Sequence, residues 1–223
     1  MQVVNDAQAA AWGEYRFGAG QRRDMAFLTV SSGIGGGIVH GGRLLRGARG
    51  IAGSLGQSPS LVGGFARLES QASVWHRRGS KGGRSADAKA VFAAARTGAA
   101  WADAILSQAA GQLAAAVAAL QAIVDPERIV VGGGVGLAEG FLERLEAALQ
   151  AYPSFLVPVL VRAELGVDAG IVGAADLAMD GRGMTAGLPG GDGDRRLRVE
   201  QAEDRTTLGQ IELAAGAGHE AAP

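Results

Sequence analysis

Two glycine-rich turns constrain the fold of this chain most, because each follows directly on a short apolar segment. The first reads SSGIGGG and closes the apolar run at 25–31, and the second reads GGGVG and follows the apolar run at 128–131. Short apolar runs bounded by glycine are typical of buried strands. Glycine makes up 37 of the 223 residues, well above ordinary usage, so these turns need a physical explanation.

Strand and helix patterns alternate along the chain. Over 125–180 a strand, a helix, a second strand and a final helix follow in turn, which indicates α/β layering. Gly41-Gly42 lies between two apolar arms and predicts a hairpin. The predicted helices span 7–17, 68–76, 85–96, 99–124, 170–179 and the stretch from the second glycine turn to about Gln150, and the further predicted strand spans 157–163.

The composition changes near residue 180. The segment 181–223 is rich in Gly, Ala and charge and has few bulky apolar residues, a composition that does not support a packed core. We therefore predict one domain over 1–180, followed by a largely disordered tail over 181–223.

Composition and charge exclude several kinds of site and partner. The chain has no cysteine, so it forms no disulfide and no cysteine-ligated metal site, and its three histidines are not spaced as metal ligands. The formal net charge is −1 with no basic stripe, so we expect no nucleic acid partner. The most apolar run, 113–124, is shorter than the roughly 20 residues of a membrane span, and no secretory signal is visible. We expect a soluble, cytoplasmic protein.

Each glycine turn has two open interpretations. The first turn could be a phosphate cradle, formed by backbone N–H groups and the hydroxyls of Ser31 and Ser32. Its glycines could instead serve a tight turn that needs positive φ. The first turn is neither a Walker A motif nor a Rossmann fingerprint, because it lacks GK[ST] and no helix follows it. The second turn joins a strand to a helix, which suits either a bound nucleotide or tight strand–helix packing.

Asn5 and Asp6 precede the predicted helix at 7–17. An aspartate at that place is most simply an N-cap. A carboxylate there can instead accept the proton of a hydroxyl group that attacks a phosphoryl group. The residue types alone leave both roles open.

Taken together, these segments resemble the ROK family of bacterial sugar kinases and related repressors. VNDAQAAAWGEY is similar to the family's catalytic segment, and FLTVSSGIGGGIVHGGRLLRGARGIAG to its second phosphate motif with the hairpin beyond it. VVGGGVGLAEGF is similar to the adenosine segment, and DAGIVGAADLA to the closing helix. The resemblance covers about 3–180 and is strongest to the N-acetylmannosamine kinases. It implies the C-terminal lobe of the actin-like, ribonuclease-H-like fold, which is a mixed sheet flanked by helices.

The resemblance also implies roles for individual residues. Asp6 would be the general base for a sugar 6-hydroxyl. The implied sugar-binding residues are Asn5, which would bind hydroxyls, and Glu69 in ARLESQAS, near the anomeric end of the sugar. The residues implied to lie against ATP are Ser32, Gly33, Gly35, Gly133 and Gly134.

The chain departs from the family at the zinc site. Typical members carry a G-H and a C-x-C-G-x-x-G-C cluster, whereas this chain has AGSLGQSPSLVGGFARLES, with Gln57 in place of the histidine and no cysteine. Zinc normally shapes the sugar-binding loop, so here packing and hydrogen bonds must do so. We expect no zinc, and Ser54 and Gln57 are candidate neutral donors to the sugar, although Gln57 could equally be a solvated loop residue.

A second departure concerns the family's N-terminal lobe. Kinases of the family carry a D-x-G-G-T phosphate loop before the Asn-Asp segment, and this sequence holds no such motif. We therefore expect the chain to represent the C-terminal lobe without that phosphate-loop lobe. The resemblance implies phosphorylation of the 6-hydroxyl of an N-acylhexosamine, foremost N-acetylmannosamine, with ATP and Mg²⁺, by a homodimer. The alternatives are a catalytically inactive ROK pseudokinase and a sugar-sensing ROK regulator.

Overall fold

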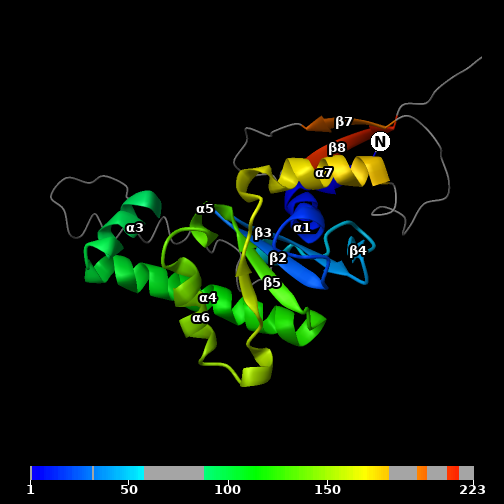
Figure 1. The fold of residues 1–223 in the computed structure, drawn as a ribbon. Coiled ribbons are helices and arrows are strands. Elements are labelled where there is room, and N and C mark those ends of the chain that lie inside the picture. The colour runs from blue at the N-terminus through cyan, green and yellow to red at the C-terminus, as the bar shows by residue number, and fades with distance from the viewer. Residues whose placement is uncertain (1, 32, 58–87, 181–194, 200–209, 216–223) are drawn as a thin grey trace, which may run out of the picture.

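A mixed sheet forms the centre of the molecule. The computed structural model describes residues 2–31, 33–57, 88–180, 195–199 and 210–215 (Figure 1). Five strands pair in the order β4-β3-β2-β5-β6, with β2 parallel to β5 and β5 parallel to β6, whereas β3 runs antiparallel to β2 and β4. The strands span Met25–Val30 (β2), Ile34–His40 (β3), Arg43–Leu44 (β4), Arg128–Gly132 (β5) and Leu160–Arg162 (β6).

One face of the sheet is covered by two helices, and a third helix packs on the longer of them (Figure 1). Leu28 and Val30 of β2 and Ile129 and Val131 of β5 point to this face, because alternate residues of a strand face opposite sides. They pack in one core with apolar side chains of the three helices, among them Phe141. These helices span Ala88–Arg96 (α3), Ala100–Val124 (α4) and Phe141–Leu149 (α6).

The opposite face packs against two helices, α1 (Asp6–Phe17) and α7 (Ala169–Asp180). Met25, Phe27 and Val130 point to this side and share a second core with Trp12, which is 2% exposed. Both faces of β2 and β5 are thus buried, as is usual for parallel strands between helix layers.

Helices α1 and α7 cross at backbone contact. A Cβ on Gly13 would lie 2.5 Å from the carbonyl oxygen of Ala169, and a Cβ on Gly173 would meet the carbonyl oxygen of Ala9 directly. Side chains are therefore excluded from the crossing, which brings α7 close to the whole length of α1.

Polar contacts also fix α1. The buried carboxylate of Glu14 accepts hydrogen bonds from the backbone N–H groups of Ala19 at 2.9 Å, Glu164 at 3.2 Å and Leu165 at 2.8 Å. The indole N–H of Trp12 donates to Asp176 on α7 at 2.7 Å. These bonds tie the end of α1 to the segment that leads from β6 to α7.

Two elements of the central layers differ from the predicted ones. The helix predicted after the second glycine turn is broken: α5 (Gly133–Gly136) is a short turn, and α6 starts after Gly140, whose φ is +78°. Strand β6 is shorter than predicted, and its start follows Pro158, which has no N–H to donate to a neighbouring strand. The helix predicted over 68–76 lies outside the described residues.

A second, three-stranded sheet pairs the two ends of the chain in the order β1-β8-β7. Its strands are Gln2–Asn5 (β1), Arg195–Val199 (β7) and Gln210–Ala215 (β8), joined by antiparallel pairing. Two of these strands fall in the segment for which disorder was predicted. The remainder of 181–223 lies outside the described residues, so the domain boundaries stay a prediction.

Helix α4 is, among the described residues, the one helix long and apolar enough to cross a membrane by length and composition. Half of its most apolar window is buried within the structure. Core helices of soluble proteins pass the same test.

The close crossing of α1 and α7 predicts opposite effects for two helical glycines. Gly173→Ala should lower the free energy of unfolding by about 1–3 kcal/mol, because the new methyl group overpacks the crossing. Gly111→Ala on α4 is the matched control: its Cβ enters open space, so the better helix former should leave stability unchanged or raise it by up to about 1 kcal/mol. Urea unfolding followed by circular dichroism measures both, and equal effects would contradict the crossing.

Candidate active site

Asn5, not Asp6, caps helix α1. The Asn5 side-chain oxygen accepts hydrogen bonds from the N–H groups of Ala7 at 3.0 Å and Gln8 at 3.3 Å. Asp6 is the first residue of the helix, and its carboxylate accepts a hydrogen bond from Ala7 at 2.7 Å. The simple expectation that Asp6 is the N-cap is therefore wrong, because its neighbour already performs that role.

The Asp6 carboxylate is more basic than an ordinary aspartate. Burial raises its pKa above 3.8, and hydrogen bonds from the N–H groups of Ala7 and of Asp6 itself oppose this shift only in part. The residue nevertheless keeps an exposed surface, so a hydroxyl group can reach its oxygens. A carboxylate that is accessible yet partly desolvated is suited to accept a proton.

The two glycine turns meet at the carboxyl ends of β2 and β5. Thr29 pairs with Gly132, so the parallel strands end side by side. Gly133 has a φ of +84°, and a Cβ there would press on the backbone of Val30 at the end of β2. The conformation of Gly133 thus brings the second turn against the first.

Packing explains part of the first glycine cluster. A Cβ on Gly35 would lie 2.8 Å from the Cβ of Ala7, and one on Gly37 would lie 2.6 Å from the Cβ of Ala11. These glycines allow α1 to lie on β3, with the Asp6 end of the helix over the start of the strand. Among the described residues, no atom lies within 4 Å of a Cβ added on Gly33 or Gly134, so packing against them does not account for these two glycines.

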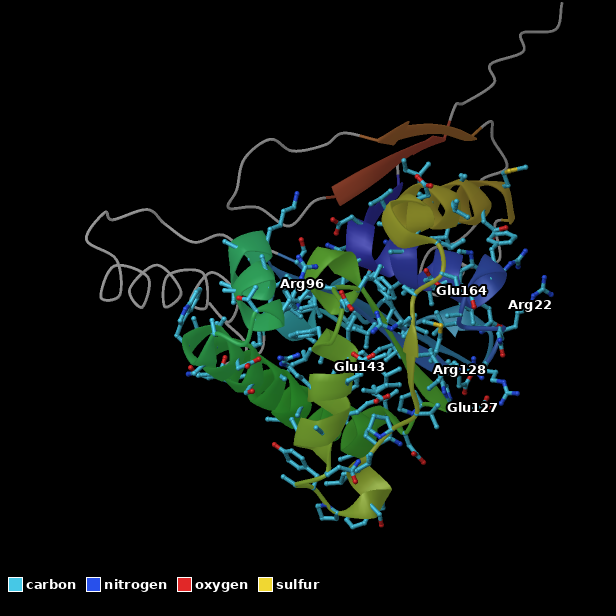
Figure 2. The ribbon with its side chains drawn as sticks, turned by 60° about the vertical axis from the view of Figure 1, so that its left-hand side comes forward. Arg22, Arg96, Glu127, Arg128, Glu143 and Glu164 are labelled. Atoms are coloured by element: carbon cyan, nitrogen blue, oxygen red, sulfur yellow. The ribbon has the colours of Figure 1, made fainter. Side chains whose placement is uncertain are left out.

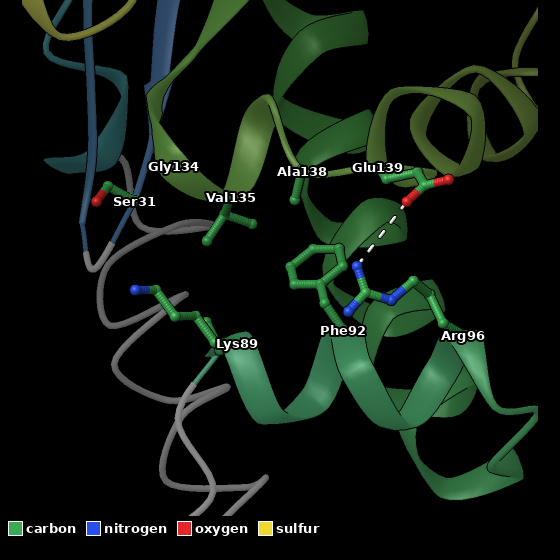
Figure 3. Close-up of a pocket in the computed structure, with 9 residues that line it drawn as sticks. Ser31, Lys89, Phe92, Arg96, Gly134, Val135, Ala138 and Glu139 are labelled. Atoms are coloured by element: carbon green, nitrogen blue, oxygen red, sulfur yellow. Dashed lines mark ion pairs between the residues drawn. The ribbon is translucent and has the colours of Figure 1, made fainter.

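A cavity of about 550 Å³ opens beside the second turn (Figure 3). Gly134, Val135 and Ala138 form one wall, and α3 forms the other with Phe92, Lys89 and Arg96. In Figure 3 the Lys89 side chain extends toward the side of Ser31, while the Phe92 ring lies in the middle. The cavity therefore has a polar end at the glycine turns and an apolar centre.

An ion pair lies at the other end of the cavity. Arg96 Nη1 lies 3.9 Å from Glu139 Oε2, and both side chains are largely exposed. Within the part of the chain that the structure describes, the Lys89 ammonium has neither an ion pair nor a hydrogen bond. Lys89 is thus the cation in this cavity wall whose charge is not already compensated.

Sequence reasoning did not single out Lys89, Phe92, Arg96 or Glu139. The signal was present, because Lys89, Phe92 and Arg96 follow an i, i+3, i+7 spacing that places them on one face of the predicted helix. The pattern could not give the direction of that face, because the direction depends on how α3 packs on α4 in the folded chain.

The candidate sugar residues are brought together only in part. Ser54 and Gln57 belong to a loop that lies on β3, where a Cβ on Gly36 would be 2.7 Å from the Gly53 carbonyl oxygen. Helix α1 rests on the same strand, so the loop and the Asp6 end of α1 both lie on β3. Ser32 and Glu69 lie outside the described residues.

Charged side chains at the opposite end of the sheet take no part in this arrangement. Figure 2 shows Arg22, Glu127 and Arg128 gathered away from Arg96. Arg128 donates to the Ala19 carbonyl oxygen at 2.8 Å, which ties the amino end of β5 to the turn after α1.

Two named relatives match most of the chain. A Brucella melitensis biotype 1 protein named bifunctional enzyme NanE/NanK is 62% identical over 184 residues, covering 80% of this chain and 35% of that protein. An Escherichia coli O157:H7 protein named N-acetylmannosamine kinase is 40% identical over 185 residues, covering 79% of this chain and 64% of that protein. The chain thus spans less than two thirds of the length of either relative.

Solved structures share the fold and the family. The ROK hexokinase from Thermus thermophilus has a TM-score of 0.66 and 36% identity, over 76% of this chain and 62% of that one. The ROK glucokinase from Streptomyces griseus, solved with glucose and AMPPNP, has a TM-score of 0.64 and 31% identity, over 79% of this chain and 67% of that one. The predicted lobe of the actin-like fold, with its mixed sheet flanked by helices, is confirmed. The ROK family model matches residues 1–181, and the chain belongs to the ROK family.

Proposed function

We propose that this chain forms the catalytic and nucleotide-binding lobe of a sugar kinase that transfers the γ-phosphoryl group of ATP to the 6-hydroxyl of N-acetylmannosamine. The observation that carries the proposal is the basic, accessible Asp6 carboxylate at the start of a helix that rests on the glycine-rich strand β3. The relatives named N-acetylmannosamine kinase and NanE/NanK support the choice of an N-acylhexosamine.

Asp6 acts as general base in this proposal. Its carboxylate accepts the proton of the sugar 6-hydroxyl as the sugar oxygen bonds to the γ-phosphorus and the bond to the ADP oxygen breaks. Burial raises the pKa of Asp6 and so strengthens the base, and the backbone N–H groups at the start of α1 offset this shift only in part. General-base assistance typically contributes about 10²–10⁴-fold to the rate.

ATP occupies the cavity between α5 and α3. The apolar centre at Phe92 and Val135 suits the base, and the open glycine turns at Gly33 and Gly134 suit the phosphates. Lys89, at the same polar end, adds a positive charge for the phosphates. Ser32, Gly35 and Gly133 keep the nucleotide-side roles that the family resemblance implies.

Mg²⁺ would accompany the nucleotide. Among the described residues, no group of three or more His, Asp or Glu side chains lies close enough to hold a metal ion alone. Mg²⁺ bound with a nucleotide is usually held by phosphate oxygens and water, with at most one or two carboxylates, so it needs no larger group of protein ligands. When bound, the ion would neutralise charge on the phosphates.

The sugar lies between the start of α1 and the loop that carries Ser54 and Gln57. Asn5 and the loop side chains would donate to hydroxyls and to the acetamido group, and Glu69 would bind near the anomeric end. The chain has no cysteine, and we propose that the loop works without zinc. A cytoplasmic homodimer is the location and assembly that the family resemblance supports.

The proposal predicts sugar-dependent ADP release by the 223-residue chain with Mg-ATP and N-acetylmannosamine. Asp6→Asn should lower the rate by about 10²-fold or more, because the base is lost, and should leave the dissociation constant for ATP nearly unchanged. N-acetylglucosamine and glucose serve as competing substrates that rank specificity.

Two outcomes would count against this assignment. If Asp6→Asn weakens ATP binding as much as it slows transfer, Asp6 is not the base. If the unaltered folded chain binds sugar and ATP without turnover, the chain is either a lobe that needs the family's D-x-G-G-T lobe for transfer or a catalytically inactive pseudokinase or regulator.

The raised pKa of Asp6 predicts how the activity depends on pH on the acid side of the profile. The kcat/KM for the sugar should fall as pH decreases through the Asp6 pKa, with a midpoint above the ordinary value of 3.8. The same shift makes Asp6 favour the folded state at low pH, and this stability is lost as pH rises through the folded-state pKa. Asp6→Asn should therefore be no less stable than the parent chain at pH 8 in thermal unfolding. A midpoint at or below 3.8, or a clear loss of stability, would contradict the desolvated carboxylate.

The uncompensated charge of Lys89 predicts a selective effect on phosphates. Lys89→Met should weaken ATP binding by about 10-fold, the size expected for a lost charged hydrogen bond, and leave adenosine binding unchanged. Arg96→Met is the matched control, since Arg96 is already paired with Glu139 and exposed, and it should change ATP binding less than about two-fold. Equal losses for ATP and adenosine in isothermal titration would contradict a phosphate contact.

A further inference from the structure

We propose that Gln8 is a positioning residue, which holds the loop at 50–57 in register with the carboxylate of Asp6. Gln8 is 1% exposed, although its side chain is polar. Its amide nitrogen donates to the Gly50 carbonyl oxygen at 3.0 Å and to the Ala52 carbonyl oxygen at 2.9 Å. Both N–H bonds of one amide thus bind alternate residues of the loop.

The place of Gln8 in the helix links the loop to the reacting end of α1. Gln8 follows Asp6 by two residues and belongs to the first turn, which Asn5 caps. The turn is rigid because Ala7 packs on Gly35 of β3. Because this rigid turn carries both Asp6 and Gln8, the loop that Gln8 binds is held at a fixed position relative to Asp6.

A second, independent contact holds the loop against strand β3. Gly53 has a φ of +83°, and a Cβ on it would lie 2.9 Å from the Cα of Gly37. The loop backbone therefore lies directly on β3 at Gly53, and Gln8 fixes it at the preceding Gly50 and Ala52. Ser54, the first of the loop's candidate sugar donors, follows directly on these two contacts.

The first half of the loop has little apolar burial, whereas Leu55 in its second half packs against the core. Ile51 is 57% exposed, and Ala52 is partly exposed. Its other backbone bonds are local, from Ala52 to Arg46 at 3.0 Å and from Ser54 to Ile51 at 3.1 Å. Segments with few buried contacts open locally, so the Gln8 amide limits such opening together with the contacts of Gly53 and Leu55.

The direct test is hydrogen exchange of the full 223-residue chain with Gln8→Met, which keeps the length of the side chain and removes both donors. We expect amides of 46–57 to exchange on the order of 10-fold faster, while those of β2 keep the parent rate. Gln150→Met is the matched control, because Gln150 is exposed and makes only a 3.5 Å bond within its own helix. Unchanged exchange over 46–57, or an equal increase in β2, would overturn the proposal.

A binding measurement tests the positioning role, which rests on the proposed function. Gln8→Met should raise the dissociation constant and KM for N-acetylmannosamine by about 10-fold or more, because small displacements of a site are costly, and should leave ATP affinity within about two-fold. Gln8→Asn keeps the amide on a side chain that is one methylene shorter, and it should therefore recover part of the loss. If Gln8→Met does not fold, both measurements are made on Gln8→Asn instead. Equal weakening of sugar and ATP would contradict positioning.

Failure of the two proposals is distinguishable. If the unaltered chain binds no sugar, the proposed function is wrong, and hydrogen exchange still decides whether Gln8 holds the loop. If the unaltered chain binds sugar and Gln8→Met binds it equally well, the function stands and the role of Gln8 is wrong.

Discussion

Helix α1 is held at backbone distance on two sides, and the rest of the structure depends on this constraint. On one side Gly13 and Gly173 let it meet α7 without intervening side chains, and on the other Gly35 and Gly37 let it lie on β3. A helix fixed in this way cannot rotate or slide without a steric clash. Its first turn therefore holds Asp6 and Asn5 at a fixed place over the sheet, which a catalytic geometry requires.

The polar interior serves the same helix. Among the described residues, the buried polar side chains are Gln8 and Glu14, and both belong to α1. Gln8 binds carbonyl oxygens of the loop after β4, whereas Glu14 binds N–H groups before α7. Each side chain satisfies backbone groups of a segment that lacks regular partners, which offsets the desolvation of a buried polar group. The helix thus organises loops at both of its ends.

Much of the fold could be predicted from the sequence, because local patterns determine it. Short continuous apolar runs bounded by glycine predicted β2 and β5, and Gly41-Gly42 predicted the hairpin, where both residues have positive φ. The family resemblance gave the order of the elements. Patterns of apolar residues did not reveal the break at Gly140, because the sequence around it continues to favour a helix.

The site could be predicted only in outline. Sequence alone left each glycine between a ligand role and a packing role, and only three-dimensional contacts separate Gly35, which packs on Ala7, from Gly33, which faces open space. The cavity wall on α3 was missed for a related reason. Residues such as Lys89 acquire a role from the direction in which a helix packs, and that direction is a property of the tertiary structure.

The pairing of β2 has a consequence for how the chain folds. Its antiparallel partner β3 is adjacent in the sequence, whereas its parallel partner β5 places Leu28 beside Val131, roughly a hundred residues away. Closing so long a loop lowers the chain entropy before the stabilising contacts between the strands can form. The local hairpin should therefore form early and the parallel pair late. The edge where both glycine turns meet exists only after that late step. Partly folded chains would therefore keep a hairpin and lack the edge proposed to bind the nucleotide. An ATP analogue that binds this edge should then act as a ligand for the completed fold alone.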